Sequence, residues 1–198
     1  MLDRDNLKGY FIVGTNMQAI MNGFGSFTLI ASKLLLREGI GTPDESMIAQ
    51  FEPTAWYPLD RVLRVFDHIQ EEFGDFTVRQ VGLQVFRTQP LPPQIVDLTS
   101  AFEGLNFAYK MVHGKGTVPL FNPATGEMKD DLGHYKWIHT KGTNKGSVES
   151  TSIYPCPFDE GLMSGAAQRF KPTATITHDR ASCRSRGGDK CIYQISWK

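Results

Sequence analysis

The sequence lacks an excess of charge of either sign. Lysine and arginine together number 21, and aspartate and glutamate together also number 21. A balanced chain creates no net field that would draw it toward nucleic acid or toward an anionic membrane surface. We therefore expect neither partner.

The sequence also lacks a long apolar run. Its longest apolar stretch is shorter and more interrupted than the roughly 20 residues that a membrane-spanning helix needs. The first residues, MLDRDNLKGYFIVGTN, place acidic side chains before any apolar segment and contain no small-residue cleavage site, unlike a signal peptide. These features predict no membrane span and a cytoplasmic location.

Motifs of common catalytic sites are absent. The sequence contains no GxSxG, no GxxxxGK[ST] and no HExxH. The adjacent pair Asp159 and Glu160 is better explained as negative charge in the first turn of a helix than as an acid/base pair. The chain is thus expected to be a binding protein without chemistry of its own.

The pattern of apolar residues predicts one α+β domain, residues 1–198, because 198 residues with 40% hydrophobic composition can bury one core. Helices come first. A segment from Trp56 to Gly74 carries an apolar face, a second helix covers Phe76 to Phe86, and a third follows the LPP break. The helical face of the first comprises Leu59, Val62, Leu63, Phe66, Ile69 and Phe73.

Alternating residues after Gly114 predict strands, in YKWIHT, SVESTSIY, ATITHDRAS and CIYQISW. One helix, CPFDEGLMSGAAQRF, is inserted among them, with Pro157 at its first helical position. Its small residues would allow another element to approach closely. The predicted architecture is N-terminal helices packed on a C-terminal twisted antiparallel sheet with one inserted helix.

Three cysteines in a reducing compartment argue against a disulfide framework. Cys183 and Cys191 flank the loop RSRGGDK, whose glycine pair permits a reversal that turns both sulfurs inward. Cys156 begins the inserted helix, where the helix dipole favours the thiolate. His178 would complete a Cys3His zinc site, with Asp179 as the competing fourth ligand on the opposite face of the strand. Buried thiols without metal are the alternative.

The runs YPCPFDEGLMSGAAQRF and THDRASCRSRGGDKCIYQISW resemble the end of 4-vinyl reductase type domains, which are related to haem nitric-oxide-binding and TRAPP proteins. The resemblance implies a structural zinc ion bound by the equivalents of Cys156, Cys183 and Cys191. In phenol-sensing activators of that group, a glutamate three residues before the second cysteine is the fourth ligand. This chain has Arg180 there, so His178 is the favoured replacement.

The same resemblance implies a sensor or carrier that binds a small apolar molecule between the helices and the sheet and signals to a partner protein. Aromatic residues that would line such a cavity, with ordinary core packing as the alternative for each, are Phe66, Phe102, Phe107, Tyr109 and Trp137. The loop residues Arg184, Arg186 and Lys190 form a basic cluster that is expected to be solvated.

Three other functions follow from relatives of the fold. A TRAPP-like subunit would dimerise through the apolar face of the Trp56–Phe73 helix. A haem-based gas sensor would need a Tyr-x-Ser-x-Arg propionate clamp, which this sequence lacks, and His113 is expected to act as a cation at a helix end. A tetrapyrrole-related reductase would need a nucleotide-binding motif, and none is present.

Overall fold

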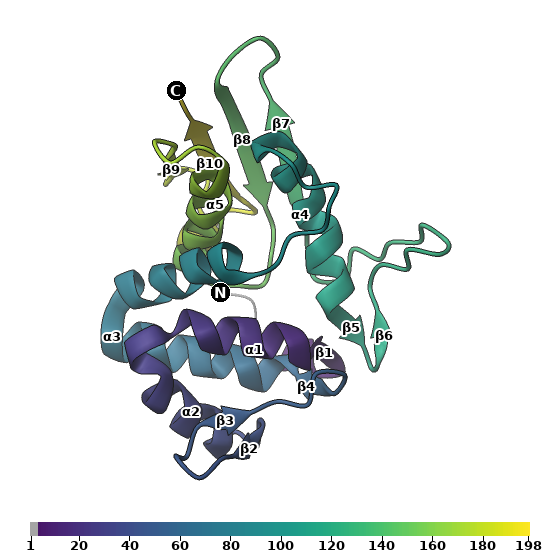
Figure 1. Ribbon diagram of the computed structural model, residues 1–198, viewed down its shortest axis with the longest axis vertical. Coiled ribbons are helices and arrows are strands. Elements are labelled where there is room, and N and C mark those ends of the chain that lie inside the picture. The colour runs from purple at the N-terminus through teal and green to yellow at the C-terminus, as the bar shows by residue number, and fades with distance from the viewer. Residues whose placement is uncertain (1–3) are drawn as a thin grey trace.

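The computed structural model describes residues 4–198 and has the predicted α+β architecture (Figure 1). Its five α-helices are α1 Gly14–Gly23, α2 Thr28–Arg37, α3 Leu59–Thr88, α4 Leu98–Val112 and α5 Cys156–Phe170. Short 3-10 turns cover Arg4–Leu7, Gly25–Phe27 and Arg184–Arg186. The strands are β1 Tyr10–Val13, β2 Thr42–Pro43, β3 Ala49–Gln50, β4 Trp56–Pro58, β5 His113–Lys115, β6 Val118–Pro119, β7 Tyr135–His139, β8 Lys145–Ser150, β9 Thr175–Asp179 and β10 Cys191–Ser196.

The long helix α3 joins two predicted helices. The break expected at Gly74 is a kink, where the backbone adopts φ 78°, a conformation that glycine tolerates best. The prediction placed the start too early, because Trp56–Pro58 pairs with β1 as a strand. The apolar face from Leu59 to Ile69 lies in the core. It is therefore not available as the dimer interface that the sequence suggested.

A four-stranded sheet of order β4-β1-β5-β6 went unpredicted. Strand β1 is only four residues long, and it pairs antiparallel with β4 and with β5, whose residues lie far away in the chain. So short a segment, lying beside a helix of similar composition, carries no periodicity of its own. The strand forms because distant partners satisfy its backbone groups.

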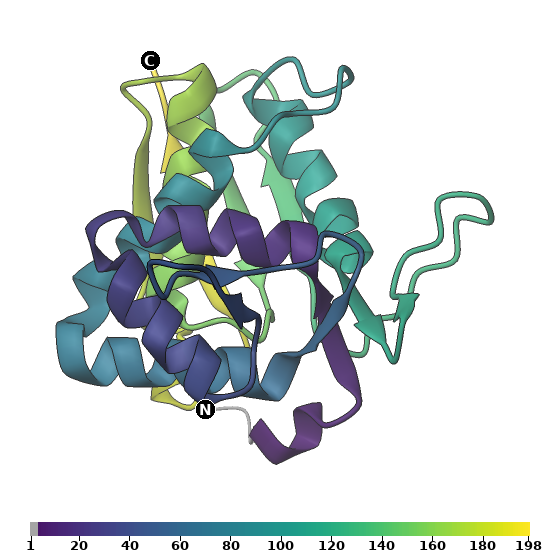
Figure 2. The same ribbon diagram turned by 60° about the horizontal axis from the view of Figure 1, so that its bottom comes forward.

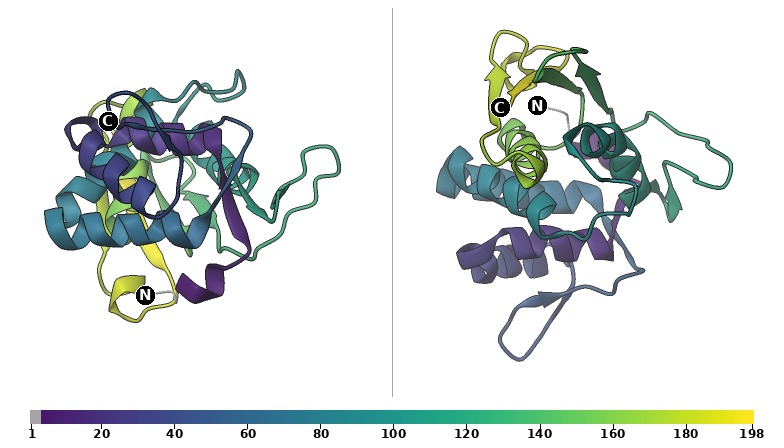
Figure 3. Two further views of the ribbon diagram at one scale, coloured as in Figure 1. Left: turned by 90° about the horizontal axis from the view of Figure 1, so that it is seen from below. Right: turned by 45° about the horizontal axis from the view of Figure 1, so that its top comes forward.

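The C-terminal sheet has the order β7-β8-β10-β9 and is antiparallel throughout. Helix α5 has the predicted bounds and lies between this sheet and α3, with α1 beyond α3 (Figure 3). Its close approach to α3 requires glycine: a Cβ at Gly161 would lie 1.9 Å from the carbonyl oxygen of Arg79. The small residues of α5 thus serve helix packing.

Between β6 and β7 the chain forms an arm that projects from the body of the molecule (Figure 2). Its base is tied to α4, because the Lys110 Nζ atom lies 3.0 Å from Asp130 and the rings of Phe107 and Phe121 are in edge-to-face contact.

In residues 4–198, no single helix has the length and apolar character of a bilayer span. Helix α1 and the helical stretch from Gly25 to Arg37 pass that test only together, bent by 107°.

Candidate metal centre and ligand groove

The three cysteines converge at one buried point. Cys156 is the first residue of α5, Cys191 is the first residue of β10, and Cys183 precedes the 3-10 turn between β9 and β10. The Sγ atom of Cys156 lies 3.7 Å from that of Cys183 and 3.3 Å from that of Cys191, and the latter two are 4.0 Å apart. Zinc–sulfur bonds of about 2.3 Å in a tetrahedron separate sulfurs by roughly 3.8 Å, so the triangle has the right size for zinc.

The imidazole of His178 is the fourth group. All four candidate ligand atoms lie within 4.8 Å of one another. His178 stacks on Tyr193 of the neighbouring strand, and neither ring nitrogen has a hydrogen-bond partner among the residues that the structure describes. A buried imidazole without partners is costly unless something binds it. A metal ion at the centre of the cluster would satisfy it.

The competing positions point elsewhere. The carboxylate of Asp179 accepts a hydrogen bond from the backbone N–H of Ala181 at 2.9 Å. The side chain of Arg180, at the family's glutamate position, is half exposed and lies 3.7 Å from Glu160. Of the two candidate fourth ligands on β9, His178 and Asp179, only His178 belongs to the cluster with the three sulfurs.

The glycine pair of the loop acts as expected. Gly187 adopts φ 88°, and the backbone N–H of Gly188 donates to the Cys183 carbonyl at 3.0 Å. This reversal brings Cys183 and Cys191 to the same side of the loop.

A buried ion pair supports the cluster, and the sequence analysis missed it. Arg184 Nη2 lies 2.6 Å from the fully buried Asp159 carboxylate, and Arg184 Nε donates to the Cys191 sulfur at 3.4 Å. Asp159 also accepts from the hydroxyls of Tyr135, Ser150 and Ser152. Asp159 lies in the first turn of α5, as predicted, and it has the buried Arg184 partner as well. The prediction of Arg184 as solvated charge was wrong, because its side chain is mostly buried against Asp159.

Burial raises the pKa of Asp159, and the Arg184 guanidinium opposes that shift. A hydrogen bond from Cys156 lowers the pKa of Cys191, with Arg184 adding to the effect, and the same bond raises the pKa of Cys156. The direction of the pKa shift of Cys156 is thus opposite to the lowering that the helix-dipole argument predicted.

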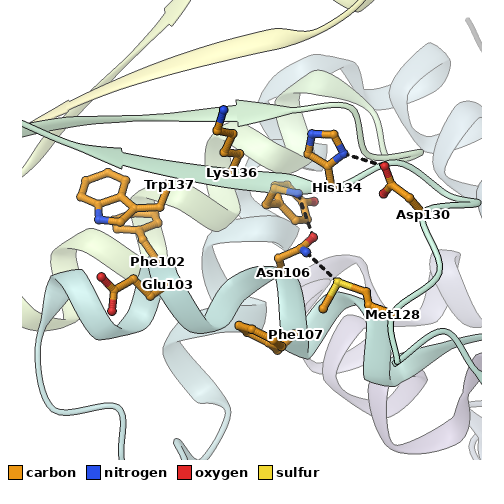
Figure 4. A pocket seen from close by; sticks show the side chains of 10 residues that line it. Phe102, Glu103, Asn106, Phe107, Met128, Asp130, His134, Lys136 and Trp137 are labelled. Carbon is orange, nitrogen blue, oxygen red and sulfur yellow. Dashed lines mark hydrogen bonds and ion pairs between the residues drawn. The ribbon is translucent and has the colours of Figure 1, made fainter. Parts of the chain in front are cut away.

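A groove of about 610 Å³ lies between α4 and β7 (Figure 4). Three predicted ligand-binding residues line it: Phe102, Phe107 and Trp137. The rings of Phe102 and Trp137 stack at 4.8 Å, and Phe107 is 47% exposed. The indole N–H of Trp137 is buried and has no hydrogen-bond acceptor within residues 4–198. The groove thus offers apolar aromatic surface beside polar side chains, which include Glu103, Asn106 and Lys136.

The other two predicted ligand-binding residues are core. Phe66 packs on Tyr154 and Phe158, and the Tyr109 hydroxyl donates to the Leu132 carbonyl at 2.7 Å. Beside them, the two ring nitrogens of His113 contact the Tyr109 carbonyl at 2.7 Å and the Tyr154 hydroxyl at 2.8 Å. Burial lowers the pKa of His113 to about 4, so it is neutral and does not act as the helix-end cation that was predicted.

No protein-family model and no curated protein matches this chain. Among solved structures it is similar to an H-NOX protein from Shewanella oneidensis in the Fe(II)NO state, at TM-score 0.63 and 16% identity, covering 94% of this chain and 99% of that one. An oxygen-binding H-NOX domain related to soluble guanylate cyclases gives TM-score 0.60 and 16% identity, with 94% and 95% covered. The chain therefore has the fold of H-NOX domains. The predicted relation to haem nitric-oxide-binding proteins is supported at the level of the fold.

Proposed function

We propose that this protein is a non-catalytic sensor or carrier domain on the H-NOX fold, which binds a small, largely apolar molecule in the groove between α4 and β7. The observation that carries the proposal is the groove itself, which the stacked Phe102 and Trp137 side chains line. Apolar walls with few polar groups are typical of small-molecule sites.

We also propose a structural zinc ion bound by Cys156, His178, Cys183 and Cys191. Four protein ligands leave no open position, so the metal would join the start of α5 to strands β9 and β10 without catalysing a reaction. Arg184 would offset part of the negative charge of three thiolates.

The haem-based gas sensor is the function that the fold comparison favours, because the similar structures are haem proteins. The residues of this chain fit haem poorly. Aromatic rings of Phe66, Tyr109, Tyr154 and Phe158 fill the space between helices and sheet, at centroid separations of 4.6 to 6.4 Å. The buried His113 is bonded at both nitrogens. The proposal therefore assigns no role to haem.

Titration with haemin is expected to produce no stoichiometric Soret band in the purified protein. His113 would have to give up two buried hydrogen bonds before it could bind iron, and the aromatic core would have to open. Visible absorption spectroscopy checks this. A Soret band at one haem per chain, lost on His113→Ala or on His134→Ala, would replace the present proposal with the gas sensor.

Trp137→Leu is expected to weaken binding in the groove by about tenfold, because it removes the aromatic surface that lines the groove. The measurement is fluorescence titration with Nile red, an apolar probe, together with native mass spectrometry for any co-purified molecule. Ile138→Ala is the matched control, since Ile138 is the next residue of β7 and is 40% exposed, and it does not line the groove. Equal binding of Nile red by the wild type and by both variants would exclude the groove as the binding site. A stable dimer without a bound molecule in native mass spectrometry would favour the TRAPP-like interaction subunit.

A further inference from the structure

A second cavity, of about 480 Å³, adjoins the cysteine cluster. Its lining includes Asp67 and Asp75 of α3 and Gly188 and Asp189 of the loop before β10. Cys156, the first residue of α5, also lines it. We call this cavity the cysteine cleft.

The cleft meets the cysteine cluster at Cys156. Cys183 and Cys191 have no exposed surface, His178 is 7% exposed, and neither these cysteines nor His178 lines the cleft. Cys156 does line it, so it is the first of the four donors that a cation in the cleft would meet. The ligand atom of Cys156 lies within 4.8 Å of that of His178, whose ring nitrogens have no hydrogen-bond partner in residues 4–198.

The charges of the cleft divide into two kinds. Of its guanidinium groups, Arg184 pairs with Asp159 at 2.6 Å, and Arg180 lies 3.7 Å from Glu160, which Arg79 also binds at 3.0 Å. Among the contacts that the structure shows for Asp75 is a hydrogen bond from the neutral amide of Gln70 at 2.8 Å, and Asp189 is exposed on the loop before β10. The lining of the cleft therefore includes one carboxylate from α3 and one from this loop whose contacts in residues 4–198 include no ion pair. Such oxygens bind divalent cations, and thiolates bind zinc more selectively.

We propose that the cysteine cleft is the port through which the metal enters the Cys3His centre, with Asp75 and Asp189 as transient oxygen ligands for a divalent cation. The inference rests on the proposed zinc site. A hydrated cation exchanges waters for carboxylate oxygens in the cleft and then exchanges these oxygens for the Cys156 sulfur. As the sulfurs of Cys156, Cys183 and Cys191 bind, the proton of each thiol leaves to a freed carboxylate or to water, and His178 completes the site.

The test is the rate of cobalt uptake. Metal-free, reduced protein is mixed with Co²⁺ in a stopped-flow instrument, and the sulfur-to-cobalt charge-transfer absorption is followed with time. The double variant Asp75→Asn, Asp189→Asn is expected to load about tenfold more slowly than wild type, with a weaker dependence on salt, because electrostatic attraction into the cleft is reduced. The final spectrum and the stoichiometry of one cobalt per chain are expected to stay the same.

The matched control is Glu71→Gln, Glu72→Gln, which makes the same change in net charge on exposed residues of α3 that do not line the cleft. It is expected to load at the wild-type rate. Equal rates for all three proteins, or equal slowing in both variants, would overturn the port. Failure of the wild type to bind any cobalt would instead overturn the zinc site, and the port with it.

Discussion

Cys183→Ser is expected to abolish stoichiometric zinc binding and to lower the melting temperature by about 10 °C. The residue is fully buried, and its sulfur is one corner of the metal-sized triangle. A metal present at a thousand times its dissociation constant adds roughly 4 kcal/mol to the free energy of unfolding, and 1 kcal/mol shifts the melting temperature of a chain of this size by about 2–4 °C. Elemental analysis and differential scanning calorimetry measure the two effects.

The comparison needs two controls. Ser182→Ala changes the neighbouring residue, whose hydroxyl donates to the Lys190 carbonyl at 3.3 Å, and it is expected to retain zinc. Wild-type protein stripped by a chelator is expected to melt near the temperature of the Cys183→Ser variant. A wild-type protein that contains no zinc and melts at the same temperature with and without chelator would contradict the structural metal.

Arg184→Met is expected to cost about 3–5 kcal/mol of folding free energy, because it leaves the Asp159 carboxylate buried without its cation. The methionine fills much of the volume of the arginine stem, so the loss reports the charge more than the packing. Arg186→Met is the control in the same 3-10 turn, where the side chain is exposed, and it is expected to change stability by less than about 0.5 kcal/mol. Urea unfolding of chelator-treated proteins separates this effect from loss of metal.

The deficit of Arg184→Met is expected to shrink as the pH falls toward 3.8, the ordinary pKa of aspartate. Burial raises the pKa of Asp159 in the folded protein, so the folded state binds this proton more tightly than the unfolded state does. The stability that the protonated group contributes is complete below the unfolded pKa and is lost as pH rises from there through the folded pKa, and removal of Arg184 enlarges that loss at neutral pH. A deficit that is the same at pH 5 and at pH 7 would show that the charge of Asp159 is not its cause.

The convergence of the three cysteines was largely predictable, because the local elements that hold them carry their own signals. The Gly187-Gly188 reversal and the proline-rich start of α5 specify where Cys183, Cys191 and Cys156 sit on their elements. The partner of Arg184 was not predictable in this way. Asp159 belongs to α5 and Arg184 to the loop before β10, and nothing in either segment indicates that they meet.

The aromatic residues show the same limit. Composition identified Phe66, Phe102, Phe107, Tyr109 and Trp137 as residues that could line a cavity, and the fold divides them between a core and a groove. Tyr109 and Phe107 lie two residues apart on α4 and therefore face in different directions. Which face meets the core depends on how α4 packs.

The sequence by itself determined the class of fold, the bounds of α5, the break at Gly74 and the convergence of three cysteines, because periodicity, glycine and proline act over a few residues. The tertiary structure decided the sheet around β1, the buried pair of Asp159 and Arg184, the neutral state of His113 and the division of the aromatic residues. Each of these depends on contacts between residues far apart in the chain, and burial at those contacts changes what a charged or aromatic side chain can do.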